Sequence, residues 1–301
     1  MNSCTQFAKR VPGTILQALE WGTRTLKQRG VESPRLDAEV LLMFCTGNGR
    51  EWLYANYTLA LKKGEWDSFN ACIQRRAKRE PVAYITGRKE FRNLTFTVNP
   101  TVLIPRPETE LLVDVVLEKC NLLKEKKNHL RILELGTGSG IIATSLAHEF
   151  DNAAIVASDS AFETITLARE NARIYKLDKK ISFFVGHFTQ ALEISKKELF
   201  FDCIVSNPPY LSETDLHNTI PEIRDYEPHN ALDGGTDGLA CYRDLLKDVH
   251  RLLDDGGFLL IEIGSMQSNA ITAMLQKTEH YSEVTTLKDL AGFDRVISAR
   301  K

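Results

Sequence analysis

Residues 130–159, LRILELGTGSGIIATSLAHEFDNAAIVASD, contain an apolar run, a glycine-rich loop, a helical stretch and a second apolar run. Glycines between a strand and a helix let the backbone turn tightly and approach a ligand closely. The GxGxG spacing is not the dinucleotide form, because Ile141 stands where that fingerprint needs its third glycine.

Asp159 ends the second apolar run, 19 positions after Gly140. An acid at the end of this strand can accept hydrogen bonds from both hydroxyls of a ribose. The combination favours a nucleotide-type binding site over a glycine turn that serves helix–strand packing alone. The predicted binding residues are Gly136, Thr137, Gly138, Ser139, Gly140 and Asp159.

The chain after residue 130 repeats this alternation of apolar runs and helical stretches. Apolar strands separated by helices indicate a parallel sheet that is covered on both faces. The last two predicted strands have no helix between them, so we expect one of them to run antiparallel at the edge of the sheet. The predicted strands are 131–136, 154–159, 181–186, 201–208, 257–264, 283–290 and 294–300. The predicted helices are 141–150, 161–175, a short one at 192–197, 239–254 and 266–279.

Residues 1–80 are predicted to form a small helical bundle. Apolar residues recur at helical spacing in 14–30, again after Ser33, and in a third helix at 66–79. We therefore expect a helical domain at this end of the chain.

Residues 81–107 show a different pattern, with apolar positions alternating around Phe91 and Phe96. This alternation indicates a β-hairpin whose turn lies at Arg92–Asn93. We interpret 81–107 as a β-hairpin linker between the helical domain and an α/β domain at 108–301.

The composition is that of an ordinary soluble globular protein, with 301 residues, 43% hydrophobic, 26% charged and a formal net charge of −2. The first residues lack the apolar core of a signal peptide, and no apolar run approaches the ~20 residues that a membrane helix needs. We therefore expect a cytoplasmic protein without a membrane partner. The six cysteines are scattered without a CxxC pair, and the histidines form no HExxH motif, so no metal site is expected.

Charge is distributed unevenly along the chain. Residues 1–80 carry thirteen Lys/Arg and eight Asp/Glu, a net charge of +5, so the remainder carries −7. The helical domain is therefore expected to meet an acidic surface.

The fourth predicted strand ends in Asn207-Pro208-Pro209-Tyr210. In open α/β sheets, ligands bind outside the carboxyl ends of the strands. The residue types suit the methylation of an amide nitrogen, which is a poor nucleophile because its lone pair is delocalised. The Asn207 side-chain oxygen and the Pro208 carbonyl can accept hydrogen bonds from its two N–H groups and aim the lone pair. Tyr210 can stack on the planar amide and favour a cationic transition state.

The predicted catalytic residues are thus Asn207, Pro208 and Tyr210, and Pro209 completes the predicted substrate site. The prolines fix φ and donate no N–H, so the Pro208 carbonyl is held in place. Orientation of the substrate amide is expected to provide most of the catalysis, and no strong base is required. The alternative is a loop that merely follows a strand.

Several segments together resemble a known family. The C-terminal two-thirds resembles the N5-glutamine methyltransferases, and the whole chain resembles the release-factor glutamine methyltransferases (the HemK/PrmC family). NPPY alone is shared with adenine-N6 DNA methyltransferases, whereas its combination with IPRPETE and EPxxAL is far more specific. The matching segments are LIPRPETE (103–110), ELGTGSG (134–140), the strand end at Asp159, NPPY (207–210) and YEPHNALDGGTDGLACYR (226–243).

The resemblance implies a class I methyltransferase domain, Rossmann-like with a seven-stranded, mostly parallel sheet. It implies S-adenosylmethionine as the cofactor, bound by Gly136 to Gly140 and Asp159, with Asn207 beside both ligands and S-adenosylhomocysteine as the product. The implied substrate is the GGQ-loop glutamine of peptide chain release factors in translation termination, methylated on N5. The helical domain would recognise it, and the enzyme would act as a monomer without binding nucleic acid.

One position departs from the family pattern. The family usually has Asp-Trp after its third strand, where this chain has His187-Phe188. Phe188 can still stack on adenine and is included in the predicted cofactor site, but His187 offers no carboxylate and is left out. Arg106 and Glu108 are expected either to reach the methionine end of the cofactor or to brace the hairpin.

Three other functions compete with this interpretation. A ribosomal-protein glutamine methyltransferase shares NPPY, but it has PRSP where this chain has PRPET. An adenine-N6 methyltransferase of nucleic acid must flip a base into its pocket and usually carries a more basic recognition region. A catalytically silent binding module is disfavoured by the intact Asn207 and Tyr210.

Overall fold

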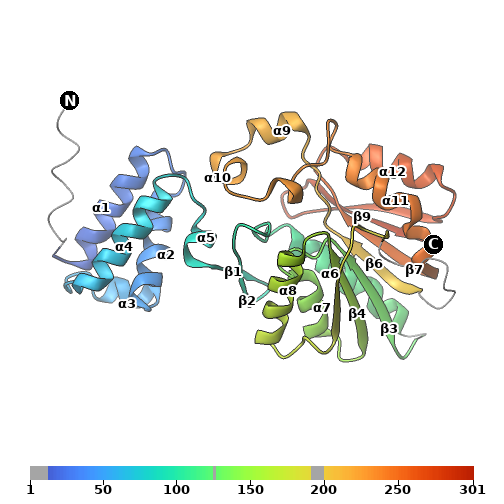
Figure 1. Ribbon diagram of the computed structural model, residues 1–301, viewed down its shortest axis with the longest axis horizontal. Helices are drawn as coiled ribbons and strands as arrows, with labels where there is room; N and C mark the ends of the chain where they lie inside the picture. Colours follow the sequence, from blue (N-terminus) through green and yellow to red (C-terminus); the bar gives the residue numbers. More distant parts are fainter. Residues whose placement is uncertain (1–12, 125–126, 191–199) are drawn as a thin grey trace. The chain divides into compact units, whose positions relative to one another are not determined.

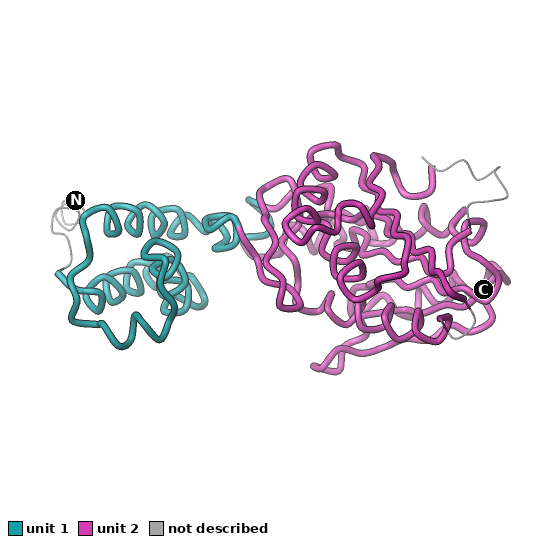
Figure 2. Tube along the Cα trace, turned by 90° about the horizontal axis from the view of Figure 1, so that it is seen from below, with its two compact units in different colours: residues 1–87, 221–226 teal, residues 88–220, 227–301 magenta. Residues whose placement is uncertain are grey.

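The computed structural model describes residues 13–124, 127–190 and 200–301, and the chain divides into two compact units (Figure 2). Unit 1 comprises residues 1–87 together with 221–226, and unit 2 comprises 88–220 and 227–301. The short helix expected at 192–197 lies outside the described residues. Within the described ranges, no helix is both long and apolar enough to span a bilayer.

Unit 1 is a helical bundle, as the sequence predicts (Figure 1). Its core includes several leucines together with Phe69 and Ile73, which are fully buried among the helices. Burying each such side chain stabilises the fold by roughly 1.5–3 kcal/mol. The helices are α1 (Ile15–Gln28), α2 (Pro34–Thr46), α3 (Arg50–Ala55), α4 (Lys63–Arg76), α5 (Val82–Thr86) and α10 (Pro221–Arg224).

The short helix α5 lies where we expected extended backbone. Pro81 precedes it, and Gly87 ends it in the left-handed conformation that favours glycine. Tyr84 and Ile85 are buried, so apolar burial selects the helical turn. The predicted hairpin is therefore present, whereas residues 82–86 form a helical turn in place of extended backbone.

The hairpin consists of β1 (Arg88–Phe91) and β2 (Leu94–Thr97), which pair antiparallel. Arg92 and Asn93 form the turn with φ of 48° and 62°. Two positive φ values are the signature of the tight turn that matches the twist of paired strands. The hairpin is part of unit 2, where Phe91 and Phe96 join the main core cluster.

A segment from late in the chain completes unit 1. Glu222, in α10, forms ion pairs with Arg76 (2.8 Å) and Arg79 (2.6 Å), and Arg76 also pairs with Asp37 at 2.7 Å. The Tyr226 hydroxyl donates to the carbonyl of Lys78 at 2.7 Å. These arginines at the end of α4 are therefore engaged in internal contacts. The chain leaves unit 2 after Ile220, contributes six residues to unit 1, and returns to unit 2 at Glu227.

Unit 2 contains a seven-stranded sheet in the order β5-β4-β3-β6-β7-β9-β8, in which all pairs except those of β9 are parallel. This confirms the predicted class I methyltransferase architecture. The strands are β3 (Leu130–Leu135), β4 (Ala153–Asp159), β5 (Ile181–Val185), β6 (Phe201–Ser206), β7 (Leu253–Glu262), β8 (Glu283–Lys288) and β9 (Asp294–Arg300). The helices of unit 2 are α6 (Thr109–Lys124), α7 (Ile141–Glu149), α8 (Phe162–Ile174), α9 (Glu213–Asn218), α11 (Ala240–Leu252) and α12 (Ser268–Lys277), with a 3₁₀ turn at His229–Ala231.

Two apolar clusters cover the two faces of the sheet, and helices lie on both sides of it (Figure 1). Alternate strand residues point to opposite faces, so Ile132 packs with α6, α7 and α8, whereas Leu133 packs with α11 and α12. This double coverage explains why the central strands are continuous apolar runs.

The antiparallel strand is β9, but it does not lie at the edge, so this part of the prediction was wrong. β9 lies between β7 and β8, and β8 forms the edge. The burial patterns fit this order, because β8 is at most half-buried along its length while Val296 to Ala299 of β9 are buried. The crossover through α12 places β8 two positions from β7, and the returning strand β9 fills the position between them.

Candidate active site

A pocket opens at the carboxyl ends of β3, β4, β5 and β6 in unit 2. β3 pairs with β4 on one of its edges and with β6 on the other, so the connections after β3 and β6 lead away in opposite directions. In open α/β sheets, the crevice left between such connections is where ligands bind. The pocket and its mouth hold about 970 Å³ of empty space. The predicted site residues that line it are Gly136, Thr137, Gly138, Ser139, Asp159, Phe188, Asn207 and Pro209.

The glycine loop is held in shape by hydrogen bonds to its neighbours. The backbone N–H groups of Gly136 and Thr137 donate to the Ser158 carbonyl at 2.9 and 2.8 Å. The carboxylate of Glu134 accepts from the Thr137 hydroxyl (2.7 Å) and the Ala143 N–H (3.0 Å). Burial raises the pKa of Glu134 to about 8. The loop is therefore preorganised by protein contacts alone.

Gly140 does not line the pocket, although the sequence placed it with the cofactor-binding residues. Its φ is +81°, and a Cβ atom there would lie 3.0 Å from the Cβ of Ala168 in α8. Close packing of α7 against α8 accounts for this glycine. By contrast, a Cβ at Gly138 would have nothing within 4 Å, so the space beside that residue is open toward a ligand.

Asp159 lines the pocket at the end of β4. Its Oδ2 accepts from the Gly138 N–H at 3.0 Å, and its Oδ1 accepts from the Ala161 N–H at 3.3 Å. Burial raises its pKa, while these backbone donors lower it. Each carboxylate oxygen has a second lone pair, so the group can accept further hydrogen bonds from a ligand.

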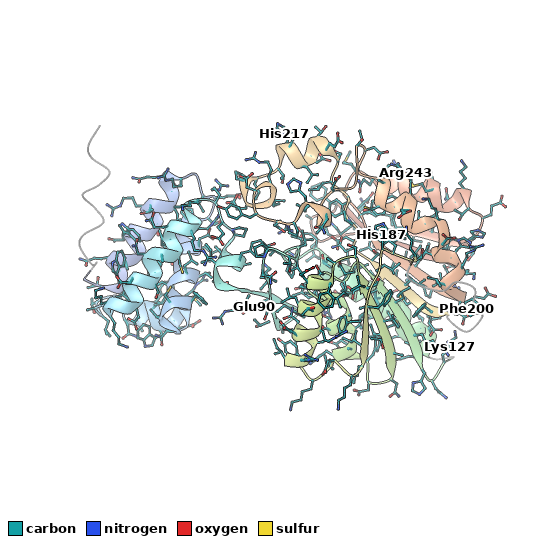
Figure 3. The ribbon with its side chains drawn as sticks, in the orientation of Figure 1. Glu90, Lys127, His187, Phe200, His217 and Arg243 are labelled. Atoms are coloured by element: carbon teal, nitrogen blue, oxygen red, sulfur yellow. The ribbon has the colours of Figure 1, made fainter. Side chains whose placement is uncertain are left out.

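The loop after β5 brings Phe188 and His187 to the pocket. Phe188 is buried, with φ of +43°, and packs in the second core cluster. His187, labelled in Figure 3, was left out of the predicted site, yet it lines the pocket and its Nε2 lies 3.0 Å from Oδ2 of Asp244 in α11. Asp244 lies 57 residues further along the chain, so local sequence gave no signal for this pair.

Asn207 directly follows β6 and lines the pocket. Its Nδ2 donates to the hydroxyl of Thr109, the first residue of α6, at 3.3 Å. Thr109 also lines the pocket and is 1% exposed. The amide nitrogen of Asn207 is thus directed at Thr109, which leaves its oxygen as the acceptor for a ligand.

The remaining residues of NPPY differ in position. Pro209 lines the pocket, whereas Pro208 and Tyr210 are not among its walls. The Tyr210 ring packs against the second core cluster, burial raises its pKa, and its carbonyl accepts from Nε2 of Gln267 at 2.9 Å. Gln267 also donates to the Gly238 carbonyl at 3.1 Å, so this side chain fixes the loop after NPPY. Sequence reasoning missed Gln267.

An ion pair joins two of the motifs that carried the resemblance. Nη2 of Arg106 lies 2.6 Å from Oε1 of Glu227, whose Oε2 accepts from the Ile104 N–H at 3.1 Å. Arg106 belongs to the IPRPETE segment and lines the pocket, while Glu108 does not. Glu227 belongs to the segment that begins YEPHNAL and is 4% exposed. Arg106 therefore braces one wall of the pocket.

Known proteins resemble the chain over nearly its whole length. Residues 17–87 match the family model described as the PrmC N-terminal domain, and residues 126–294 match one described as a methyltransferase domain. The release factor glutamine methyltransferase of Moorella thermoacetica is 40% identical over 286 residues, which cover 95% of this chain and 98% of that protein. The release factor glutamine methyltransferase of Geobacter sulfurreducens is 37% identical over 287 residues, which cover 95% and 96%.

A solved methyltransferase structure from Pyrococcus furiosus superposes with a TM-score of 0.51 at 20% identity, covering 76% of this chain and 98% of that one. At this identity the likeness concerns the fold alone.

Proposed function

The chain belongs to the family of release factor glutamine methyltransferases, and from this we propose that it methylates the side-chain nitrogen, N5, of the glutamine in the Gly-Gly-Gln loop of peptide chain release factors. One observation within the pocket carries the proposal. Asn207 presents an amide oxygen in the same pocket as Asp159, so an acceptor for a substrate amide and an acceptor for a ribose share one cavity.

The donor in this proposal is S-adenosylmethionine, and the residues present suit it. Asp159 keeps acceptor capacity for the ribose hydroxyls, the open space beside Gly138 admits a ligand to the backbone, and Phe188 offers an aromatic wall for adenine. When bound, S-adenosylmethionine supplies a methyl group on a positively charged sulfur and leaves as S-adenosylhomocysteine. Asp159 and the glycine loop would hold this donor in the pocket that Asn207 also lines.

Asn207 and Pro208 act on the other reactant. The Asn207 oxygen and the Pro208 carbonyl would accept hydrogen bonds from the two N–H groups of the substrate amide and so orient its lone pair. Pro208 needs to present only its backbone, which agrees with its buried side chain. Pro209 forms the adjoining wall, and Gln267 fixes the Tyr210 backbone. Stabilisation of the cationic transition state by the Tyr210 ring, which packs in the second core cluster, remains a prediction. The methylated amide then loses its proton to water, so positioning provides the catalysis.

The ribose contact gives the first prediction. Asp159→Ala should weaken S-adenosylmethionine binding by about 1–3 kcal/mol, the cost of losing charge-assisted hydrogen bonds. Isothermal titration calorimetry measures this directly. Asp151→Ala is a matched control, because that carboxylate is almost fully exposed, forms an ion pair with Lys180 and does not line the pocket. Equal affinity of the Asp159 variant and the wild type would place the ribose elsewhere.

The substrate is tested by incubating the enzyme with labelled S-adenosylmethionine and three separate candidates, a bacterial-type release factor, a ribosomal protein and DNA. We expect label on the release factor, and mass spectrometry should locate one added methyl group on the glutamine of its Gly-Gly-Gln loop. Label on the ribosomal protein or on DNA in place of the release factor would refute the proposal.

The domain bounds 1–80, 81–107 and 108–301 remain a proposal, as does a recognition role for the first of them. Its positive charge supports docking on an acidic surface of the release factor. The cytoplasmic location and the monomeric state likewise remain predictions from the sequence.

A further inference from the structure

Glu262 is the last residue of β7 and is fully buried. In the parallel pair of β6 and β7, Ser206 lies opposite Ile261, so the next residues, Asn207 and Glu262, lie side by side at the pocket edge of the sheet. Leu260 packs in the core cluster on the α6 face. Because side chains alternate along a strand, Glu262 points to that same face, where Thr109 begins α6.

The carboxylate of Glu262 is an expensive group to bury without a partner. Among the described residues, neither of its oxygens has a hydrogen bond of normal geometry. Burial raises its pKa to about 7, while the nearby side chains of Thr109 and Asn207 lower it. The charged groups that face it are Arg295 of β9, which lowers its pKa, and Glu108, which raises it. The neutral titratable groups beside it are Tyr210 and Tyr242, whose own pKa values Glu262 raises. A group this costly calls for a function.

The amide of Asn207 has two orientations that nearly superpose, and only one of them is productive. When Oδ1 points toward the pocket, Asn207 accepts a hydrogen bond from the substrate amide. In the flipped form, the Asn207 NH₂ group points at the NH₂ group of the substrate, and no hydrogen bond can form. The Thr109 hydroxyl does not discriminate between these forms, because it can donate or accept. An ionised carboxylate can only accept, so it stabilises the form whose nitrogen points away from the pocket.

We propose that Glu262 is a positioning residue whose carboxylate, with Thr109, fixes the orientation of the Asn207 amide and thereby presents the Asn207 oxygen to the substrate. This role rests on the proposed function. Glu262 acts through Asn207 and does not itself contact the substrate. Protonation of Glu262 gives it an O–H donor, which removes its preference for the productive form. Turnover should therefore rise with pH as Glu262 ionises around pH 7.

The test compares Glu262→Gln with Glu262→Asp in the full chain, with the intact release factor as substrate. Glu262→Gln keeps the shape but can present a donor or an acceptor, so kcat should fall by about 10- to 100-fold. The rise of kcat with pH through 7 should disappear in this variant. The dissociation constant of S-adenosylmethionine should change less than about threefold, since Glu262 does not line the pocket and lies beside Asn207.

Glu262→Asp shortens the side chain but preserves a carboxylate, which when ionised can only accept hydrogen bonds. The orienting role predicts that this variant keeps more turnover than Glu262→Gln and keeps a rise of kcat with pH. A packing role predicts the reverse order, because glutamine fills the site and aspartate leaves a gap. Thermal unfolding separates the two effects, since Glu262→Gln removes a buried charge and should not lower the midpoint.

The outcomes are distinct. If the wild type labels no release factor, the proposed function fails and this inference fails with it. If the wild type labels the factor and Glu262→Gln retains its kcat and its pH dependence, only the positioning role fails. The positioning role also fails if Glu262→Asp has a lower kcat than Glu262→Gln at every pH.

Discussion

Asn207→Ala should lower the turnover number by about 100- to 1,000-fold, comparable to the loss of one preorganised hydrogen-bonding group from a catalytic site. The substitution removes the oxygen that we propose aligns the substrate amide, and it leaves Asp159 and the glycine loop in place. Affinity for S-adenosylmethionine should fall much less than turnover. Single-turnover kinetics with the intact release factor and calorimetry with the cofactor measure the two quantities separately.

Asn230→Ala is the matched control for this substitution. Asn230 also lines the pocket, but it lies in the 3₁₀ turn and not at a strand end. The same chemical change there should cost far less turnover. Near-normal turnover of Asn207→Ala, or equal losses in both variants, would remove Asn207 from the mechanism.

Deletion of residues 1–87 should abolish most methylation of the intact release factor while binding of S-adenosylmethionine persists. All walls of the pocket belong to unit 2, so the cofactor site does not depend on the deleted helices. Recognition of the protein surface away from the glutamine is assigned to the deleted region. Methyl transfer to the intact factor, measured as kcat/KM, should fall by about 100-fold or more, the loss expected when remote binding energy is removed.

A short Gly-Gly-Gln peptide distinguishes lost recognition from a damaged site. The peptide offers only the reacting loop, so it should be a poor substrate for the full chain and equally poor for the truncated enzyme. A lower rate of the truncated enzyme on the peptide would indicate damage to unit 2. An unchanged rate on the intact factor would show that the deleted region does not recognise it.

Local patterns in the sequence were sufficient for most of the fold. Apolar runs such as 201–206 predict buried strands because both faces of a parallel sheet are covered, and the observed burial follows this pattern. The strand ends also predicted that the glycine loop, Asp159 and Asn207 would meet, since the carboxyl ends of parallel strands share one edge. The pocket contains all three.

The parts that could not be predicted depend on contacts between distant residues. Nothing near Arg79 indicates its partner Glu222, 143 residues away, and nothing near His187 indicates Asp244. The position of β9 depends on where the crossover places β8, which periodicity does not encode. Glu262 did leave a signal, because it is a lone charge in the apolar run GFLLIEIG, and such a charge at a strand end merits attention.

Unit 1 consists of two separate stretches of the chain, so its two parts leave the ribosome at different times. At ~5–20 residues per second, the chain between Gly87 and Glu222 takes roughly 7–27 s to synthesise. During that interval Arg76 and Arg79 of the nascent bundle lack the carboxylate of Glu222, and α10 has not been synthesised. The N-terminal helices therefore emerge first but reach their final stability only after most of unit 2 has been translated, and in the meantime their unfinished surface is available to chaperones.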